Sequence, residues 1–377
     1  MENPLKRLSA LGDLFKPKES SAIGVDIGSS FIKVVQLKKK GGRAVLETYG
    51  ELALGPYAGL KLGQMTSLES AKLSEALGDI LKEANVTTRN AAISIPFASS
   101  LISLIQLPNV PESQLDTIVP IEARKYIPVP IGEVSLDWWL IPKHDEYEIG
   151  KEAIPAGVLP KSSTRNEVLI AAIHNDTITK YQDIVKKVGL TSVFFEIEMF
   201  STIRSTFGRD MQLVIVLDMG AGSTKLSIVE YGVVRGSHVI DRGSQNITMA
   251  LSQSLSIPIE QAEEMKRTYG LVGKEGDTNI KQTIELSTDY IFTEVNRVLL
   301  DYERRFNKSI GKIILTGGGV LLKGFKEKAK ETLQAEVIYG DPFSKVEAPA
   351  FLDNLLKEAG PEFSVAIGLA LRKLQDA

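Results

Sequence analysis

The chain has 377 residues, of which 43% are hydrophobic and 24% are charged, a globular balance with enough length to bury cores for two lobes. A formal net charge of −3 gives no field that would favour nucleic acid as a partner. The absence of cysteine excludes disulfide frameworks, thiolate zinc sites and cysteine nucleophiles, and it fits a reducing compartment. No apolar run approaches the roughly 20 residues that span a bilayer, so the sequence predicts a cytoplasmic protein.

Residues 1–20 form a predicted N-terminal amphipathic tail. Leu5, Leu8, Leu11 and Phe15 recur at three- and four-residue spacing among basic residues, before Pro17 breaks the pattern. Such a pattern is typical of a short helix that lies on an anionic membrane surface, which would give peripheral membrane association. A frayed tail and a helix docked on the protein itself remain open as alternatives.

A strand–turn–strand segment follows, with apolar runs at 22–25 and 31–37 on either side of a turn of small residues. Glycine and serine let backbone N–H groups approach phosphate oxygens, because no bulky side chain intervenes. A lysine after the turn would neutralise phosphate charge as a point cation. The pattern predicts a phosphate loop, although a plain β-turn fits an isolated Asp-x-Gly at least as well. The candidate nucleotide-binding residues here are Asp26, Gly28, Ser29, Ser30 and Lys33.

The spacing of Leu73, Leu77 and Leu81 predicts a helix over residues 67–84, because all three leucines fall on one face. A small α+β unit is expected after it. Its predicted elements are a strand at 100–107, a helix introduced by Pro111 and ended by Pro128, and strands at 133–141 and 167–173.

Two segments of this α+β unit are candidates for a role beyond the core, a pair of tryptophans and a long loop. Trp138 and Trp139 are neighbours in a predicted strand, so their side chains should point to opposite faces. An exposed tryptophan is typical of a partner surface, while core packing of both fits the sequence equally well. The stretch 144–165 mixes charged residues with proline, glycine and serine, and it predicts a solvated hairpin loop.

The chain then returns to the first lobe. A helix is expected over 176–188, with Asp176 as its N-cap and Gly189 as its stop. A strand at 192–196 and a helix that begins near Glu198 lead towards the second half of the chain.

The phosphate-loop pattern appears a second time at residues 217–225, between a strand at 213–217 and a strand at 225–229. The aspartate, the glycine-bearing turn and the lysine seven residues after the aspartate recur at the same spacing. Two such hairpins can face each other across a cleft, and their aspartates, Asp26 and Asp218, suit a magnesium ion held directly or through its waters. The candidate residues of the second copy are Asp218, Gly220, Gly222, Ser223, Thr224 and Lys225.

Two later segments fit the remainder of a nucleotide. Residues 311–319 predict a strand that runs into three glycines, and such a run lets adenine lie flat against the backbone. Residues 260–267 have strong helix propensity, and two residues three apart in that helix would share one face and reach a ribose or purine together. The residues concerned are Gly317, Gly318, Gly319, Glu263 and Lys266.

Taken together, these motifs resemble those of the actin-like ATPase superfamily, which contains actin, DnaK-type chaperones and sugar kinases. Residues 26–33 match its first phosphate motif, 218–224 its second and 315–319 its adenosine motif. Within that superfamily the chain is similar to the FtsA and PilM branch, and most similar to the type IV pilus assembly family PilM, over nearly its whole length. The segments that indicate this branch are 173–176, 261–266 and 315–322.

The resemblance implies an α/β fold of two ribonuclease-H-like lobes with an inserted small α+β subdomain, and it implies ATP and Mg²⁺ as cofactors. The implied organisation is a tail over 1–20, a first lobe over 21–96 and 175–208, the inserted subdomain over 97–174, a second lobe over 209–242 and 309–377, and a helical subdomain over 243–308.

Catalysis in this superfamily needs a residue that orients the attacking water or serves as a base for an acceptor hydroxyl. Glu196 and Glu198 lie in the segment between the lobes where such a group would sit, and Glu198 is the candidate catalytic residue. Met199 stands where relatives commonly carry proline, and Glu198 equally fits a helix start that favours the dipole. We therefore expect firm ATP binding with slow or absent hydrolysis.

Three functions follow from the resemblance. A nucleotide-gated adaptor would close on ATP and dock the cytoplasmic tail of an inner-membrane pilus protein, as PilM does with PilN, which places it at the inner face of that membrane. An FtsA-like division protein would self-associate into filaments, but residues 363–377 predict a docked helix without FtsA's basic amphipathic tail. A small-molecule kinase would need an acceptor-binding insertion and a base, neither of which is evident.

Overall fold

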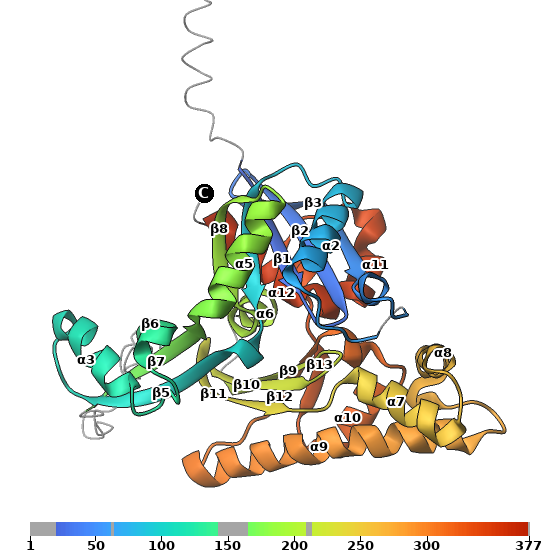
Figure 1. The fold of residues 1–377 in the computed structure, drawn as a ribbon. Helices are drawn as coiled ribbons and strands as arrows, with labels where there is room; N and C mark the ends of the chain where they lie inside the picture. The colour runs from blue at the N-terminus through green and yellow to red at the C-terminus, as the bar shows by residue number, and fades with distance from the viewer. Residues whose placement is uncertain (1–19, 62–63, 142–164, 209–212, 376–377) are drawn as a thin grey trace, which may run out of the picture.

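The computed structural model describes residues 20–61, 64–141, 165–208 and 213–375. Two lobes, each built on a five-stranded sheet, lie one above the other, and a third sheet of three strands projects to one side (Figure 1). The predicted two-lobed α/β fold with an inserted α+β subdomain is therefore confirmed. The tail predicted over 1–20 lies outside the described residues except for Ser20, and so does the loop predicted over 144–165 except for Arg165.

The two large sheets have the same topology. The first has the order β3-β2-β1-β4-β8 and the second β11-β10-β9-β12-β13. In each, the first two strands form an antiparallel hairpin (β1 with β2, β9 with β10). The first strand of that hairpin pairs on its other side with a parallel strand (β4 or β12), which in turn pairs with a second parallel strand (β8 or β13). The first sheet comprises β1 (Ser21–Ile27), β2 (Phe31–Lys40), β3 (Arg43–Ala53), β4 (Asn90–Ile95) and β8 (Thr191–Ile197). The second comprises β9 (Leu213–Met219), β10 (Thr224–Glu230), β11 (Val233–Ile240), β12 (Lys312–Thr316) and β13 (Glu336–Tyr339).

Helices cover both faces of the first sheet. On one face, α2 (Ser70–Glu83) and α5 (Asn175–Lys187) bury their apolar sides, including the predicted leucine stripe of α2. On the other face lies α12 (Ser364–Gln375), which packs against β1, β2 and β4. A Cβ built on Gly24 would lie 1.9 Å from the Ala366 carbonyl oxygen, so the absence of a side chain allows this approach. The sequence had placed all of 309–377 with the second lobe, yet α12 packs on the first sheet.

The second sheet lies between two apolar layers. One face buries side chains against α7 (Ser244–Leu255), α9 (Thr278–Phe306) and α10 (Phe325–Thr332), with α8 (Ile259–Tyr269) beside α7. The other face packs against α6 (Glu198–Thr206) and part of the inserted sheet. A short helix, α11 (Asp353–Ala359), precedes α12. Because α6 also packs on α12, it lies between the two lobes.

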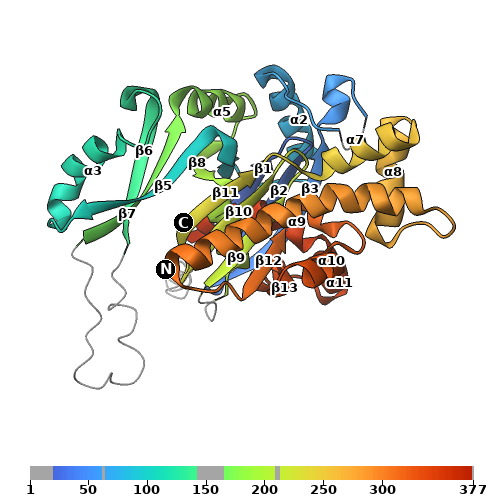
Figure 2. The same cartoon turned by 90° about the horizontal axis from the view of Figure 1, so that it is seen from below.

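The inserted sheet has the order β5-β7-β6, all antiparallel, and comprises β5 (Ser100–Pro108), β6 (Val134–Ile141) and β7 (Arg165–His174). Helix α3 (Leu115–Ala123) packs on one face, and the other face turns towards the lobes (Figure 2). As predicted, the adjacent tryptophans point to opposite faces: Trp138 packs with the α3 side, and Trp139 is 43% exposed and contacts the Phe200 ring with centroids 5.5 Å apart.

Several local predictions were wrong. Asp176 is not the N-cap of α5: the helix begins at Asn175 after His174, and no side chain caps it. The acidic group lies in the first turn, where it favours the helix dipole instead. Helix α2 begins at Ser70 rather than at residue 67. Helix α3 accommodates Pro120 and already ends at Ala123, ahead of Pro128. Gly189 does adopt the left-handed conformation expected after a helix, with φ of 69°.

Candidate nucleotide-binding site

The two predicted phosphate loops have the same local geometry. In the first, the Gly28 N–H donates to the Phe31 carbonyl over 2.9 Å, and in the second the Gly220 N–H donates to the Ser223 carbonyl over 2.9 Å. Each aspartate stands opposite its lysine across the hairpin, Asp26 opposite Lys33 and Asp218 opposite Lys225. Because both turns follow the first strand of their sheets, one at the end of β1 and one at the end of β9, the topology repeats the loop as well as the sheet.

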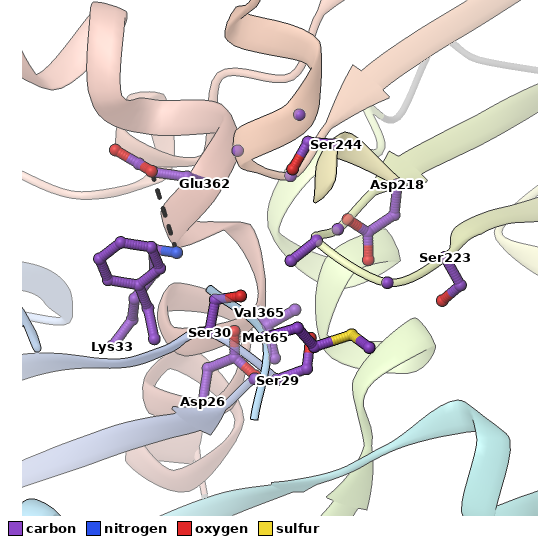
Figure 3. Close-up of a pocket in the computed structure, with 18 of the residues that line it drawn as sticks. Asp26, Ser29, Ser30, Lys33, Met65, Asp218, Ser223, Ser244, Glu362 and Val365 are labelled. Atoms are coloured by element: carbon purple, nitrogen blue, oxygen red, sulfur yellow. Dashed lines mark ion pairs between the residues drawn. The ribbon is translucent and has the colours of Figure 1, made fainter. Parts of the chain in front are cut away.

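A cavity of about 820 Å³ lies between these two turns and is lined from both lobes (Figure 3). Its volume is in the range of small-molecule and cofactor sites. Of the predicted residues, those that line it are Asp26, Gly28, Ser29, Ser30, Lys33, Glu198, Asp218, Gly220, Gly222, Ser223, Lys225, Glu263, Lys266, Gly317, Gly318 and Gly319. The structure thus brings together five segments that are far apart in the sequence.

Thr224 is the predicted residue that does not line this cavity. Its side chain is fully buried, and its Oγ1 donates to the Arg242 carbonyl over 2.8 Å. Successive residues of a strand point to opposite faces, so Thr224 at the start of β10 turns away from the side that Ser223 and Lys225 face. Thr224 therefore stabilises the turn from the face of the strand that points away from the cavity.

The two aspartates sit in an acidic and poorly solvated part of the cavity. The Ser94 hydroxyl donates to Asp26 Oδ1 over 2.9 Å. Burial, together with the negative charge of Glu198, raises the pKa of Asp26 to about 6 despite the opposing charge of Lys33. Burial also raises the pKa of Asp218, against the lowering effect of Lys225. Both carboxylates would gain from a cation that offsets their desolvation.

Glu198 is the first residue of α6 and reaches from the first lobe to the second. Its Oε1 accepts the Phe97 N–H over 2.6 Å, and its Oε2 lies 2.8 Å from Lys225 Nζ. Lys225 Nζ is also 3.7 Å from Asp218 Oδ2. Burial lowers the pKa of Lys225, but the carboxylates of Glu198 and Asp218 more than offset this and raise its pKa overall.

The other glutamate considered from the sequence, Glu196, is fully engaged elsewhere. Arg204 donates to both of its carboxylate oxygens over 2.6 Å, and the Ser201 hydroxyl donates to it as well. Such a bidentate pair holds β8 to α6, and Glu196 is not among the residues that line the cavity.

Glu263 and Lys266 share one face of α8, as predicted, and form an ion pair of 2.6 Å. The Lys266 ammonium also donates to Thr248 Oγ1 over 2.9 Å. Burial lowers the pKa of Lys266. Burial alone would raise the pKa of Glu263, but Lys266, Thr248 and Arg267 bring it below its usual value. These contacts therefore hold the side chains of Glu263 and Lys266 in place without a ligand.

The three glycines after β12 enter the cavity at close backbone approach. Gly317 has φ of 83°, and a Cβ on it would lie 2.4 Å from Asp218 Oδ1. Gly319 packs as tightly against Met219. At Gly317 a side chain is excluded both by backbone conformation and by space, so the run brings peptide groups rather than side chains to the ligand.

The donor set suits a polyphosphate with magnesium. Within the described part of the chain, the buried Ser30 hydroxyl has no hydrogen-bond partner. It is therefore available to donate to a bound ligand. Across those residues no three His, Cys, Asp or Glu side chains come close enough to hold a metal ion by themselves. Magnesium at Asp26 and Asp218 would thus take its other ligands from phosphate oxygens and water, as is usual for this ion.

Sequence reasoning missed several residues of this cavity. Met65 lies in a loop before α2, and its sulfur is 2.4 Å from the position of a Cβ on Gly222. Its N–H donates to Gln245 Oε1 across the cleft over 2.8 Å. Glu362 lies 3.9 Å from Lys33 (Figure 3). Ser94 does not line the cavity, but from the end of β4 its hydroxyl donates to Asp26. None of them belongs to a local motif, so only the folded chain reveals them.

The repeated topology, with a nucleotide-sized cavity between the two turns, defines the chain as a member of the actin-like ATPase superfamily. A family model described as type IV pilus assembly protein PilM matches residues 24–374. The chain belongs to this PilM family, as the sequence predicted.

Known relatives agree with this assignment. A solved PilM-PilN type IV pilus biogenesis complex is 26% identical with a TM-score of 0.77, and the match covers 94% of this chain and 98% of that one. The cell division protein FtsA of Neisseria meningitidis serogroup B is 25% identical over 349 residues, which is 84% of this chain and 82% of the relative. MreB5 of Spiroplasma citri bound to ADP, at 11% identity and a TM-score of 0.51, covers 96% of this chain and 98% of its own, and shows the same fold.

Proposed function

We propose that this protein is a nucleotide-gated adaptor of type IV pilus assembly, which docks the cytoplasmic tail of an inner-membrane pilus protein when ATP and Mg²⁺ are bound. Its place would be the cytoplasmic face of the inner membrane. No helix of the described residues is long and apolar enough to cross a membrane.

The observation that carries the nucleotide part is the pairing of the two turns across one cavity. Gly28 and Gly220 direct equivalent backbone segments into it, and the Ser30 hydroxyl is buried without a protein partner in the described chain. Lys33 supplies positive charge, while Asp26 and Asp218 would hold magnesium, which supplies charge neutralisation at the phosphates. Glycines 317–319 and the Glu263–Lys266 pair would accommodate adenosine.

The gating part rests on α6, which connects the cavity with the inserted subdomain. Its first residue, Glu198, pairs with Lys225 of the second lobe, and two residues later Phe200 contacts the exposed Trp139 of β6. A change in the separation of the lobes would displace Glu198 and with it α6, the helix against which Trp139 packs. The joint between α6 and β6 is accordingly the partner surface that we favour, because exposed tryptophan is enriched in binding hot spots.

The partner part rests on family membership and on the likeness to the PilM-PilN complex. An extended cytoplasmic tail that docks in a groove is a common recognition mode. Glu198 remains a candidate for orienting an attacking water, although its pairing with Phe97 and Lys225 also explains its presence structurally. We expect hydrolysis to be slow or absent, since an adaptor needs only a bound nucleotide.

Calorimetric titration with ATP and magnesium tests the nucleotide part. The parent protein should bind, and the variants Asp218→Phe and Gly222→Val should not, while their circular dichroism spectra remain those of the parent. Binding by these variants as tight as that of the parent would refute the site.

Capture of partners from solubilised membranes, with and without ATP, tests the adaptor part. A pilus inner-membrane protein retained in an ATP-dependent manner supports the proposal, and Trp139→Ala should weaken that retention. Retention of a tubulin-like division protein instead, together with nucleotide-dependent self-association in light scattering, would favour the FtsA-like alternative that the Neisseria relative suggests.

A further inference from the structure

We propose that one end of the first sheet, the end opposite the nucleotide cavity, binds an anionic membrane surface directly. This end, which we call the basic edge, is where β1, β4 and β8 begin and where the β2–β3 hairpin turns (Figure 1, top). The proposal concerns a surface far from the cavity and stands whether or not the protein binds nucleotide.

The hairpin between β2 and β3 supplies the densest charge. Lys39, Lys40 and Arg43 are exposed around the turn formed by Gly41 and Gly42, and Lys38 precedes them. Three consecutive lysines, of which Lys39 and Lys40 are exposed, thus stand next to the hairpin turn with no apolar side chain among them. Basic residues in such a position contribute additively to attraction by an anionic bilayer.

Neighbouring segments extend the same sign of charge along the edge. Lys82 lies in the last turn of α2, and Lys186 and Lys187 lie in the last turn of α5, all exposed. Exposed Arg89, just before β4, joins these segments, because its Nη1 donates to the Val188 carbonyl over 3.4 Å and its own carbonyl accepts the Thr191 N–H over 2.8 Å. The edge is thus continuous from the hairpin to α5.

The two ends of the described chain meet at this edge. Lys39 N–H donates to the Ser20 carbonyl over 2.9 Å, and Lys39 Nζ lies 3.5 Å from the Leu374 carbonyl. The last turn of α12 therefore brings Arg372 and Lys373 to the edge.

Acidic residues at the edge are fewer than basic ones. Glu347 pairs with Arg43, while Glu47, Glu83 and Asp183 keep their charge beside the basic residues. A chain with a net charge of −3 has therefore gathered a positive surface at one end. Such segregation creates a local field that the overall charge conceals.

A lipid surface fits this edge better than a nucleic acid does. Among the described residues, none of the large hydrophobic side chains that are exposed lies on these segments, so no aromatic platform is available for base stacking. Lipid headgroups require only charge. The cavity is lined by residues at the opposite end of β1, such as Asp26 and Ile27, so the basic edge and the cavity lie at different ends of the first sheet.

Sedimentation with vesicles tests the proposal. The full-length protein should bind vesicles of phosphatidylglycerol and phosphatidylcholine at low salt and not vesicles of phosphatidylcholine alone. Lys39→Gln with Lys40→Gln should lower the partition coefficient about thirtyfold, since each basic residue near the surface contributes roughly fivefold. Lys39→Arg with Lys40→Arg should preserve binding.

The matched control is Arg304→Gln with Lys330→Gln, which changes the net charge equally at exposed positions of the second lobe. It should bind vesicles as the parent does. The proposal fails if the edge variant binds like the parent, if both double variants lose binding equally, or if an oligonucleotide duplex rather than the vesicles is bound in an edge-dependent manner.

Discussion

Glu198 and Lys225 form an ion pair of 2.8 Å that joins the start of α6 in the first lobe to β10 in the second. The carboxylates of Asp26 and Asp218 lie near this pair, and burial, together with the charge of Glu198, raises the pKa of both. The three carboxylates of Glu198, Asp26 and Asp218 are thus offset only in part by Lys33 and Lys225. Both the closure of the lobes and the titration of the aspartates should depend on Glu198.

Glu198→Gln should lower the pKa of Asp26 from about 6, because the charge of Glu198 contributes to raising it. The amide oxygen can still accept the Phe97 N–H, so the start of α6 should be preserved. Titration of the Asp26 carboxyl by NMR should show the shift. Glu196→Gln is a poor control because it breaks the Arg204 pair, whereas Glu51→Gln changes an exposed carboxylate at the cavity rim and should leave Asp26 unchanged.

Asp26→Asn should stabilise the ligand-free protein at neutral pH while it weakens magnesium–nucleotide binding. The folded-state pKa of about 6 exceeds the unfolded value near 3.8, so protonated Asp26 favours folding below pH ~4 and this stability is lost as pH rises through 6. The gain from asparagine should thus be largest above pH 7, up to about 3 kcal/mol, and vanish towards pH 4. Ser94 can still donate to the asparagine oxygen.

Chemical denaturation at several pH values measures this dependence. Asp183→Asn, at an exposed position on α5, is the matched control and should show no such trend. A destabilised Asp26→Asn protein at pH 8 would contradict the interpretation that burial raises the carboxyl pKa.

Gly222→Ala should reduce ATP affinity by at least about tenfold, because a Cβ stands between the backbone amides and the phosphates. The same Cβ would lie 2.4 Å from Met65 Sδ, at the end of a flexible side chain that can move aside, so folding should survive. The double variant with Met65→Ala separates the two effects. If it regains parental affinity, the contact with Met65 rather than the phosphate loop explains the loss. Gly132→Ala, with open space around it, is the neutral control.

Local patterns in the sequence predicted most of the strands and several helices, because alternating or continuous apolar runs report burial directly, but they did not identify β3, β4, β11 or β13. They also predicted the cavity lining wherever a turn carried glycine, as at Gly28 and Gly220. They could not predict that Met65 reaches the second turn or that α12 packs on β1, since both contacts join distant parts of the chain. The N-cap assigned to Asp176 was wrong because a cap depends on backbone geometry that composition does not specify.

A second bridge, between the inserted subdomain and the second lobe, supports the last prediction. Arg235 of β11 lies 2.8 Å from Glu167 of β7 and 3.0 Å from Glu230 of β10, and Lys308 also pairs with Glu230. Arg235→Met would remove the partner of the partly exposed Glu167 and one of the two partners of the buried Glu230, and should destabilise the protein by about 2 kcal/mol. The exposed pair of Arg297 with Glu294 offers a control, in which Arg297→Met should cost less than about 1 kcal/mol.

The same variant separates stability from gating. If the Arg235–Glu167 bridge carries the movement of the second lobe to the inserted sheet, Arg235→Met should retain ATP affinity but lose the ATP dependence of partner capture. A double-mutant cycle with Glu167→Gln should give a coupling energy of about 1 kcal/mol or more. Additive stability losses together with unchanged ATP-dependent capture would show that the bridge contributes to packing alone, and would favour α6 as the connection between the cavity and the partner surface.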